Sequence, residues 1–460
     1  MSVSSVGDIL DIGTYLKIFA TKGVYSQLPS QSDLWKYIKS KKVAKPEGRE
    51  VRYAIKTGRG PSASQFLAAN EGGSFPRKQQ NKIVEAIGYF KEFGTTIGVP
   101  MNLLNKTGSE LAQYAMPLAD ELEEKGIGTA RMLSRSLLGD GTGALGVVSS
   151  VSVSSSKLSV VLNATSAAAG RSHVGNFQMD ELVRFGEVDG SYSNKINNNA
   201  DTVYYWKVTG INIVTDTLTL TPYDVNDAVI TVTAVTHAND PGASDLIYPI
   251  GDLSLSMTFP DVTSNTTVGD YAKASLAMAG LESLIANDGR TVAGLVMDGT
   301  LAGSQLDASG ATIDRSHFQS LLSQIKNRVG KNEYKYASAL MYSTTYDAML
   351  ESWETDRQIS SIKDTDRGSS ALGYQHGKDN LKFDTDEFIS KQRIYILPEG
   401  DVIHYRGTDI EKVTVGGVSE FMPAGTNGSH KREILSYLSG SGFLFNTYPA
   451  ACGIIKNFAV

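Results

Sequence analysis

The sequence predicts an α+β fold, and the spacing of its apolar residues is the reason. Apolar residues recur at three and four positions over residues 111–122 and 318–329, which is the period of amphipathic helices. Over residues 49–56, apolar and charged residues alternate instead, which is the period of a strand with one buried face. Both periods occur in long stretches of the same chain, so helices and sheets are both expected.

Residues 107–146 contain the longest predicted helix. Thr107 is followed three residues later by a glutamate, the spacing of a capping box that satisfies backbone N–H groups of the first turn. Gly126 and Gly128 each weaken a helix by about 1 kcal/mol relative to alanine. We therefore expect a kink or short break there, followed by a second helical piece over about 129–138.

A glycine run at residues 141–146 has the letters of a dinucleotide-binding loop. In such a site the glycines follow a strand and open a helix, so that the helix N-terminus faces the pyrophosphate. Here the run follows a helix, whose C-terminus carries partial negative charge. A helix stop followed by a turn is the favoured interpretation, and a dinucleotide-binding enzyme remains a distant alternative.

Composition restricts the class of protein. The chain has 460 residues, of which 41% are hydrophobic and 20% charged, so it can bury a core. Its net charge of −6 argues against nucleic-acid binding as the main task, because such proteins usually carry a basic surface. The charge does not exclude a protein shell that encloses nucleic acid without binding it tightly.

The single cysteine and the lack of targeting signals indicate a cytosolic protein. Cys452 excludes an intrachain disulfide framework, and its apolar neighbours predict a buried position. No apolar stretch is long enough to span a membrane. The N-terminus lacks the basic start and apolar core of a signal sequence.

The N-terminal part of the chain predicts two appendages. Residues 1–47 hold two apolar clusters that are too short to fold alone, so we expect an extended arm that packs on something else. Residues 48–100 predict a long hairpin, with strands at 49–56 and about 82–92 and a glycine-rich charged loop between them. Because a two-stranded hairpin is marginal by itself in water, we expect it to lie on a neighbouring subunit.

The rest of the chain predicts a β-rich block followed by a mixed block. Residues 147–265 are rich in Ser, Thr, Val, Asn and Asp and predict a small antiparallel β module. Its strands are expected near 203–208, 211–214, 218–221 and 229–233, with surface loops at 167–175 and 194–201. Beyond it, helices are expected at 271–285, 314–330 and 343–353, strands at 338–342 and 393–400, a polar loop at 356–379, and two apolar strands within 434–458 that close a core sheet.

We find no catalytic or metal-binding pattern in the sequence. The six histidines, at 173, 237, 317, 376, 404 and 430, are far apart and are expected on loops or helix surfaces. The aspartate pairs at 364/366 and 384/386 lack the further ligands of a calcium loop and are expected to be solvated. No hydrolase elbow, phosphate-binding loop or activated nucleophile is recognisable, so the chain is predicted to be no enzyme and to need no cofactor or metal.

The order of these parts resembles that of tailed-bacteriophage major capsid proteins. Residues 137–146 after the long helix, residues 339–350 and the terminal strands are similar to stretches of that family. The resemblance covers most of the chain in architecture and much less of it in letters. It implies the Hong Kong 97 phage coat fold, with an N-terminal arm (1–47), an extended loop (48–100), a peripheral domain with the spine helix (101–146), an added β-rich module (147–265), an axial domain (266–412) and a return to the peripheral domain (413–460).

The resemblance also implies a function. A major capsid protein self-assembles through hexamers and pentamers into an icosahedral shell around double-stranded DNA, inside the host bacterial cytoplasm. Implied partners are other copies of the chain, scaffolding, portal and decoration proteins, and packaged DNA held by weak non-specific contacts, with no membrane. The alternative is an encapsulin, a bacterial cargo shell of the same fold. A secreted β-rich adhesin is disfavoured by the missing signal sequence.

Opposite charges on the predicted hairpin and helix indicate electrostatic registry between subunits. The candidate contacts are the basic residues Arg52, Lys56, Arg59, Arg77 and Lys78 and the acidic residues Glu121, Glu123 and Glu124.

Reversing Glu123 and Glu124 to lysine is expected to impair assembly without unfolding the subunit, because the change places like charges opposite one another. Particle yield by sedimentation and subunit folding by circular dichroism test this. A normal particle yield from the double variant contradicts the predicted registry.

Overall fold

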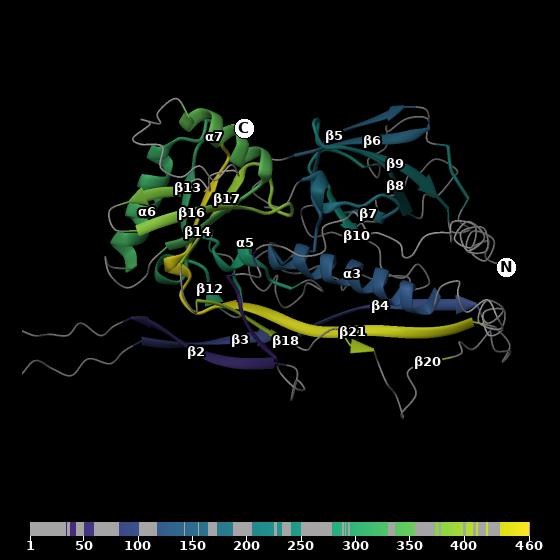
Figure 1. Ribbon diagram of the computed structural model, residues 1–460, viewed down its shortest axis with the longest axis horizontal. Coiled ribbons are helices and arrows are strands. Elements are labelled where there is room, and N and C mark those ends of the chain that lie inside the picture. The colour runs from purple at the N-terminus through teal and green to yellow at the C-terminus, as the bar shows by residue number, and fades with distance from the viewer. Residues whose placement is uncertain are drawn as a thin grey trace, which may run out of the picture.

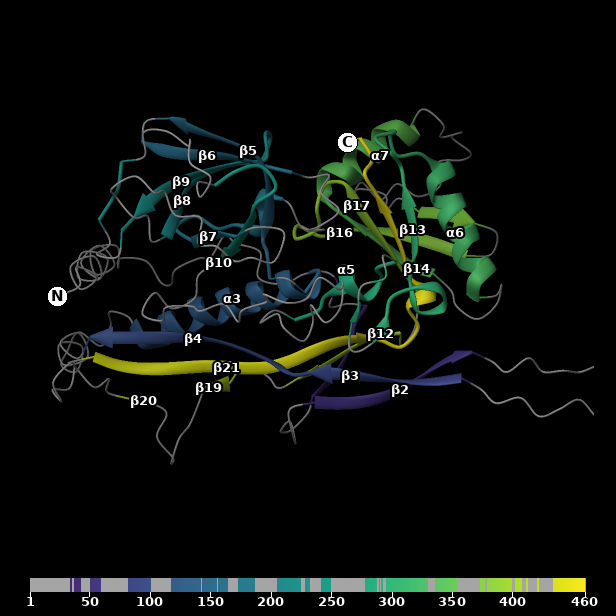
Figure 2. The ribbon, with the colours of Figure 1, turned by 180° about the vertical axis from the view of Figure 1, so that it is seen from behind.

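The structure is a computed structural model in which a long helix lies between a long sheet and a closed barrel, with a second sheet beside the barrel (Figure 1). It describes residues 34, 37–42, 50–58, 82–100, 117–141, 143–154, 156–163, 173–186, 205–224, 228–231, 241–249, 278–287, 289, 291–292, 295–329, 336–354, 373–376, 379–398, 402–407, 411–412, 420–421 and 433–459. The view from behind shows the same layers (Figure 2).

Helix α3 (Pro117–Leu137) is the long helix of the described residues. The predicted start near Thr107 lies outside those residues. The predicted break is wrong, because the helix continues through Gly126 and Gly128. Contacts made by its C-terminal half offset the weak helix propensity of the two glycines. The predicted stop and turn are confirmed, since Gly141 and Gly143 have φ angles of 87° and 81° and strand β5 begins at Gly146.

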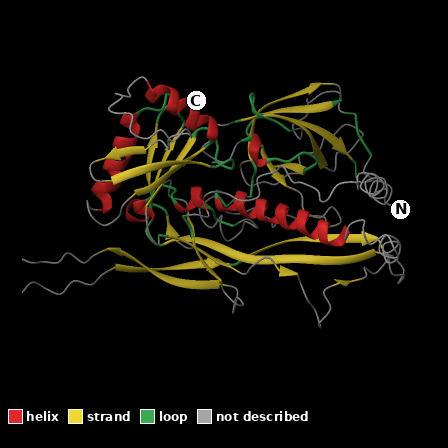
Figure 3. Ribbon diagram, viewed as in Figure 1, coloured by secondary structure: helices red, strands yellow, loops and turns green. Residues whose placement is uncertain are grey.

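The long sheet is organised around β21 (Glu433–Asn446). One edge of β21 pairs antiparallel with β4 (Lys91–Pro100). The other edge pairs antiparallel with β18 (Ile403–Gly407), β19 (Glu411–Lys412) and β20 (Glu420–Phe421). Helix α3 lies beside β4 along this sheet (Figure 3).

Part of the predicted arm lies on its own chain, which corrects the expectation that the arm packs elsewhere. Strand β1 (Lys39–Lys42) pairs parallel with β18. Leu34 is fully buried in an apolar cluster that also contains Ile38 and Leu137. Burying two large aliphatic side chains contributes several kcal/mol, about 1.5–3 for each, so Leu34 and residues 37–42 pack within their own chain. Residues 1–33 lie outside the described part of the chain.

The aspartate pair at 384/386 holds this arm segment, so the prediction of simple solvation in a loop is wrong. Asp386 is 3% exposed, and its carboxylate accepts hydrogen bonds from the backbone N–H of Leu34 (3.3 Å) and of Phe388 (2.9 Å). The Tyr37 hydroxyl donates to Asp384. A buried carboxylate needs such donors, because desolvating it without partners is costly.

The predicted hairpin is confirmed as β2 (Glu50–Gly58) paired with β3 (Lys82–Tyr89). Its loop, residues 59–81, is not among the described residues. Ile55 and Ala86 pack against Leu295 of β12 (Leu295–Val296), which pairs with β11 (Thr291–Val292). The base of the hairpin therefore contacts its own chain, which differs from the expectation of support from a neighbour alone.

The β module is a closed antiparallel barrel in the strand order β10-β5-β6-β9-β8-β7. Two strand predictions are corrected. Residues 205–212 form one strand, because a bulge at Val208–Gly210 keeps the pairing continuous where two strands were expected. Val229 forms only an isolated bridge with Tyr223. The strands are β5 (Gly146–Ser154), β6 (Lys157–Leu162), β7 (Leu182–Gly186), β8 (Tyr205–Asn212), β9 (Thr217–Tyr223) and β10 (Leu246–Pro249), with the short helix η2 (Val174–Asn176) before β7.

The second sheet has the order β13-β22-β17-β14-β16-β15. Its strands are β13 (Ser304–Asp307), β14 (Tyr336–Met341), β15 (Gly373–His376), β16 (Asp379–Thr385), β17 (Arg393–Pro398) and β22 (Gly453–Lys456), flanked by η3 (Gly299–Leu301) and η4 (Pro449–Ala451). The predicted helices appear as α6 (Arg315–Val329) and α7 (Ser343–Glu354), which cover one face of this sheet.

Two predictions in this region need correction. Residues 373–376 of the predicted polar loop form the edge strand β15. In the described part of the predicted helix 271–285, only α5 (Leu281–Leu284) is helical.

The predicted domain boundaries stay predictions. Within residues 413–460, β21 belongs to the long sheet and β22 to the second sheet.

A close backbone approach excludes a side chain at residue 280. A Cβ atom added to Gly280 would lie 2.3 Å from the backbone nitrogen of Gly139 and 2.4 Å from the carbonyl oxygen of Ser136, at the end of α3. Gly280 is extended, and α5 begins directly after it.

Replacing Gly280 with alanine is therefore expected to lower the free energy of unfolding by about 1–3 kcal/mol through overpacking. Gly126→Ala is the matched control, since no atom lies within 4 Å of its added Cβ, and it is expected to raise stability by about 0.5–1 kcal/mol. Urea unfolding measures the change in the free energy of unfolding for each variant. Equal changes in the two variants contradict the close approach at Gly280.

Candidate functional site

Two buried arginines on α3 join the helix to the barrel. Arg131 Nη2 donates to the carbonyl oxygens of Gly175 (2.9 Å) and Phe177 (3.2 Å). Arg135 Nη1 donates to the carbonyl oxygen of Asn176 (2.5 Å) and to Glu181 Oε1 (2.8 Å). Residues four apart on a helix lie on the same face, so both guanidinium groups reach η2 and the residues that lead from it to β7.

The electrostatics of this helix–barrel joint depend on burial. The Arg135–Glu181 pair is almost enclosed, with side chains 8% and 14% exposed. Burial lowers the pKa of Arg131 to about 10, and the neighbouring charge of Arg135 adds to the effect. The Arg131 guanidinium also lies 5.5 Å from the ring centre of Phe388, which belongs to the turn after β16. The joint therefore touches helix, barrel and second sheet.

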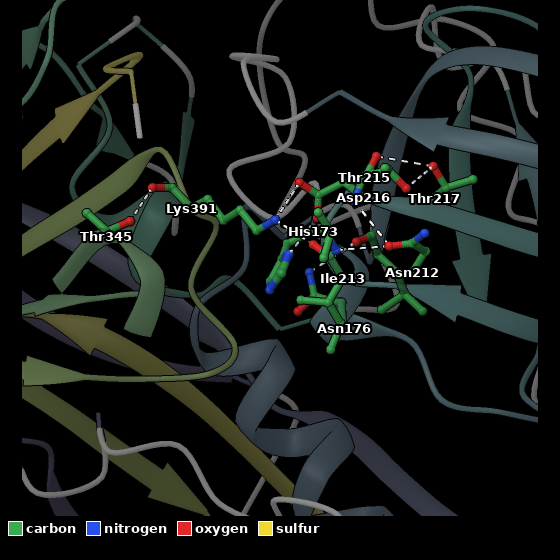
Figure 4. Close-up of polar contacts among 11 residues, drawn as sticks. His173, Asn176, Asn212, Ile213, Thr215, Asp216, Thr217, Thr345 and Lys391 are labelled. Atoms are coloured by element: carbon green, nitrogen blue, oxygen red, sulfur yellow. Dashed lines mark hydrogen bonds and ion pairs between the residues drawn. The ribbon is translucent and has the colours of Figure 1, made fainter. Parts of the chain in front are cut away.

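A second polar cluster joins the barrel to the second sheet (Figure 4). Lys391, in the turn before β17, donates through Nζ to Asp216 Oδ2 (2.9 Å) and to the carbonyl oxygen of Ile213 (2.7 Å). His173 Nδ1 lies 3.2 Å from the other carboxylate oxygen of Asp216. The hydroxyl of Thr345 on α7 donates to the Lys391 carbonyl oxygen at 2.6 Å and fixes the lysine backbone. Residues far apart in sequence thus meet at one carboxylate.

The Asp216 carboxylate is held in its charged form. Burial alone raises the pKa of this group, but hydrogen bonds from His173 and Lys391 outweigh that effect, so the pKa lies below its ordinary value. His173 is 1% exposed, which corrects the prediction that it lies on a surface loop. Its ring packs edge-on against Tyr342, with ring centroids 4.3 Å apart. Burial, followed by the charge of Glu387, raises the pKa of Tyr342.

The turn that presents Asp216 is held by its own hydrogen bonds. Asn212 Oδ1 accepts from the backbone N–H groups of Val214 (3.0 Å) and Thr215 (3.3 Å). Asp216 has φ 48°, a left-handed conformation that aspartate tolerates better than most residues. The β8–β9 turn is therefore shaped before it meets Lys391.

The predicted inter-subunit residues lie elsewhere, and their role stays a prediction. Arg52 and Glu85 form an exposed ion pair across the hairpin at 3.6 Å. Lys56 lies in β2 opposite Ile83, and its side chain is outside the described atoms. The acidic residues Glu121, Glu123 and Glu124 lie on α3 with side chains that are likewise not described, and the described part of the chain does not include Arg59, Arg77 or Lys78.

Sequence reasoning missed the residues of both joints. Arg131 and Arg135 had a usable signal, since two arginines one turn apart follow the acidic stretch of the helix. His173, Asp216 and Lys391 had none, because they come from three separate segments that only the folded chain brings together.

The described residues form neither a metal-binding cluster nor a membrane-spanning helix. Within the described ranges, no group of three or more His, Cys, Asp or Glu residues is placed to hold a metal ion. None of the described helices is long and apolar enough to cross a membrane. Cys452 is fully buried, as predicted, and burial raises the pKa of its thiol to about 12.

Comparison with known proteins shows the fold. No protein-family model matches the chain, and no curated protein matches it. Among solved structures, the capsid asymmetric unit of cyanophage A-1(L) matches with a TM-score of 0.50 and 8% identity, over 96% of this chain and 98% of that chain. The chain therefore has the α+β, Hong Kong 97-type capsid fold predicted from its sequence.

Two further matches have lower TM-scores. A Mycobacterium phage Adephagia structure gives 0.41 at 8% identity, over 98% of this chain and 97% of that chain. The holo-SrpI encapsulin complex of Synechococcus elongatus PCC 7942 gives 0.41 at 9% identity, over 98% and 95%.

Removing the Arg135 cation tests the helix–barrel joint. Arg135→Met removes the cation beside Glu181, which is 14% exposed and keeps a hydrogen bond from the backbone N–H of Gln178, so we expect a loss of about 1.5–3 kcal/mol in the free energy of unfolding. Adding Glu181→Gln removes the stranded charge and is expected to recover part of that loss. Urea unfolding provides the measurement.

The control for this test is Lys207→Met. Lys207 pairs with Asp180 at 2.8 Å on the barrel surface, where the aspartate side chain is 73% exposed, so the expected cost is at most about 1 kcal/mol. If Arg135→Met lowers the free energy of unfolding no more than Lys207→Met does, the helix–barrel joint does not stabilise the fold as described.

Proposed function

We propose that this chain is the major capsid protein of a tailed bacteriophage. It self-assembles through hexamers and pentamers into an icosahedral shell that encloses double-stranded DNA. The observation that carries the proposal is the fold likeness to the cyanophage A-1(L) capsid, which extends over 96% of this chain and 98% of that one. A match to one domain alone would leave the function of the remaining residues undefined. This match covers nearly all of both chains.

The shape of the subunit supports a role as a shell tile. The long sheet, α3 and the hairpin form an elongated base, with the barrel and the second sheet on one side of it (Figure 3). An elongated subunit offers different surfaces at its two ends, and head-to-tail contacts between different surfaces close into rings. The outer face of the hairpin presents Arg52, Glu85 and Ile83, which is 63% exposed, to a neighbour.

The partners follow from this role. Other copies of the chain are the main partner, and scaffolding, portal and decoration proteins complete the particle. The net charge of −6 favours weak, non-specific contact with packaged DNA over tight binding. The protein has a structural role and no catalytic one. The shell assembles in the host bacterial cytoplasm, and the protein then forms part of the virion.

Electron microscopy of the purified protein tests the proposal. Closed shells built from five-fold and six-fold rings are expected, and particles isolated from the native source are expected to protect double-stranded DNA from nuclease. Shells that enclose a protein cargo in place of DNA support the encapsulin alternative. A purified chain that stays monomeric at high protein concentration contradicts both the capsid proposal and the encapsulin alternative.

A further inference from the structure

The barrel is attached to the rest of the subunit by two joints with different chemistry. The helix–barrel joint consists of Arg131 and Arg135 on α3 and the segment around η2. The barrel–sheet joint consists of His173 and Asp216 on the barrel and Lys391 on the second sheet. The two joints contact the same short segment, because His173 directly precedes η2.

Most hydrogen bonds of the helix–barrel joint do not involve a titrating acceptor. Three of the acceptors are backbone carbonyl oxygens, those of Gly175, Asn176 and Phe177. Asn176 is itself fixed from the barrel side, since its side chain donates to the carbonyl oxygen of Leu145 at 3.1 Å. Glu181 is the one carboxylate among the described partners of the two arginines. This joint therefore keeps most of its contacts when carboxylates are neutralised.

The barrel–sheet joint depends on a single carboxylate. Asp216 binds His173 through one oxygen and Lys391 through the other. The remaining titratable groups that face it are Tyr342, whose ring packs on His173, and Glu387, whose backbone carbonyl lies close to Gly175. Within the described residues, the Lys391 ammonium group donates to Asp216 and to the carbonyl oxygen of Ile213. Asp216 is therefore its carboxylate partner there.

The imidazole of His173 is placed to support the charged carboxylate. Nδ1 lies 3.2 Å from Asp216 Oδ1, and Nε2 is buried without a hydrogen-bond partner among the described atoms, so we assign the proton to Nδ1. With the proton on Nδ1, Nε2 carries only a lone pair, so no donor is left unsatisfied. A protonated, neutral Asp216 no longer attracts Lys391 as an ion, and the joint loses its electrostatic attraction.

We propose that His173, Asp216 and Lys391 form an acid-sensitive latch, which fixes the barrel to the second sheet and, when it opens, lets the barrel tilt about the helix–barrel joint relative to that sheet. The inference concerns the single subunit and does not depend on shell formation.

The direction of the pH effect follows from Asp216. Its pKa in the folded chain is lower than its ordinary value, so its contribution to the latch is fully present above the unfolded value of about 3.9. The contribution is lost as the pH falls through the folded pKa. The latch is therefore closed near neutral pH and opens in acid, below about pH 4.

Distances between spin labels on the full chain test the proposal. The single native cysteine, Cys452, is buried and does not compete for the label. Labels at Ser152→Cys on β5 and Glu351→Cys on α7 report the distance from the barrel to the second sheet. Labels at Ser152→Cys and Lys125→Cys on α3 report the distance from the barrel to the helix. All three positions are exposed, and dilution with unlabelled chain isolates distances within one subunit.

At neutral pH, both label pairs are expected to give narrow distance distributions. As the pH is lowered stepwise from about 3.9 through the folded pKa of Asp216, which lies below that value, the barrel–sheet distribution is expected to widen at least twofold while the barrel–helix distribution stays narrow. Asp216→Asn is expected to give the wide barrel–sheet distribution already at neutral pH and to abolish its pH dependence. Lys391→Gln is the second variant with the same expectation, in case the first does not fold.

Asp180→Asn is the matched control, because it removes another barrel carboxylate that pairs with a lysine, Lys207, away from the latch. It is expected to behave like the unaltered protein. Circular dichroism confirms that each sample is folded. An unchanged barrel–sheet distribution of the native chain in acid overturns the proposal. So does an equal widening of both label pairs, because the helix–barrel joint has then opened as well.

Discussion

The last two turns of α3 are in contact with the three main β units at once, and this burial sets the arrangement of the subunit. Leu137 and Leu138 are buried in a cluster that contains Leu34 and Ile38 from just before β1, side chains from β18 and β21 of the long sheet, and side chains from β14, β17 and β22 of the second sheet. In the same two turns, Arg131 and Arg135 bind the barrel. Because interiors are packed at the density of organic crystals, the two sheets cannot shift along this helix end independently, while polar contacts hold the barrel to it. Gly280 lies against the backbone of Ser136 and Gly139 at this helix end, where no side chain fits.

Buried polar groups supply orientation that apolar packing alone does not. The Tyr395 hydroxyl donates to Glu282 Oε2 at 2.5 Å, and Arg393 Nε lies 3.6 Å from the other oxygen of this carboxylate. Asp386 holds the backbone of Leu34 in the same way from a distant part of the sequence. Replacing such groups by apolar ones of similar size is often neutral for stability, whereas removing one partner is costly. Their effect is therefore to make one arrangement of the segments better than its alternatives, in which a carboxylate would be buried alone.

The features that were predictable from the sequence are those determined within a few residues. Alternation over 49–56 gave the hairpin strand, the period over 318–329 gave α6, and the glycines at 141 and 143 gave the turn. The errors share a cause. A local rule made Gly126 and Gly128 a break, but contacts of the following turns keep the helix whole. The arm segment, the Asp384/Asp386 pair and the Asp216 cluster depend on partners more than 170 residues away, and no spacing in a single sequence encodes such partners.

The same distinction explains how this fold persists at 8% identity to the cyanophage capsid. A fold is specified by periods of apolar residues, by turn residues and by the filling of a shared interior, and many sequences satisfy those conditions with different letters. The contacts that hold the parts of this subunit together use few side chains, such as two arginines for the barrel and one aspartate for the second sheet. Apolar packing around the end of α3 and these few polar contacts therefore keep the architecture while most residue identities differ.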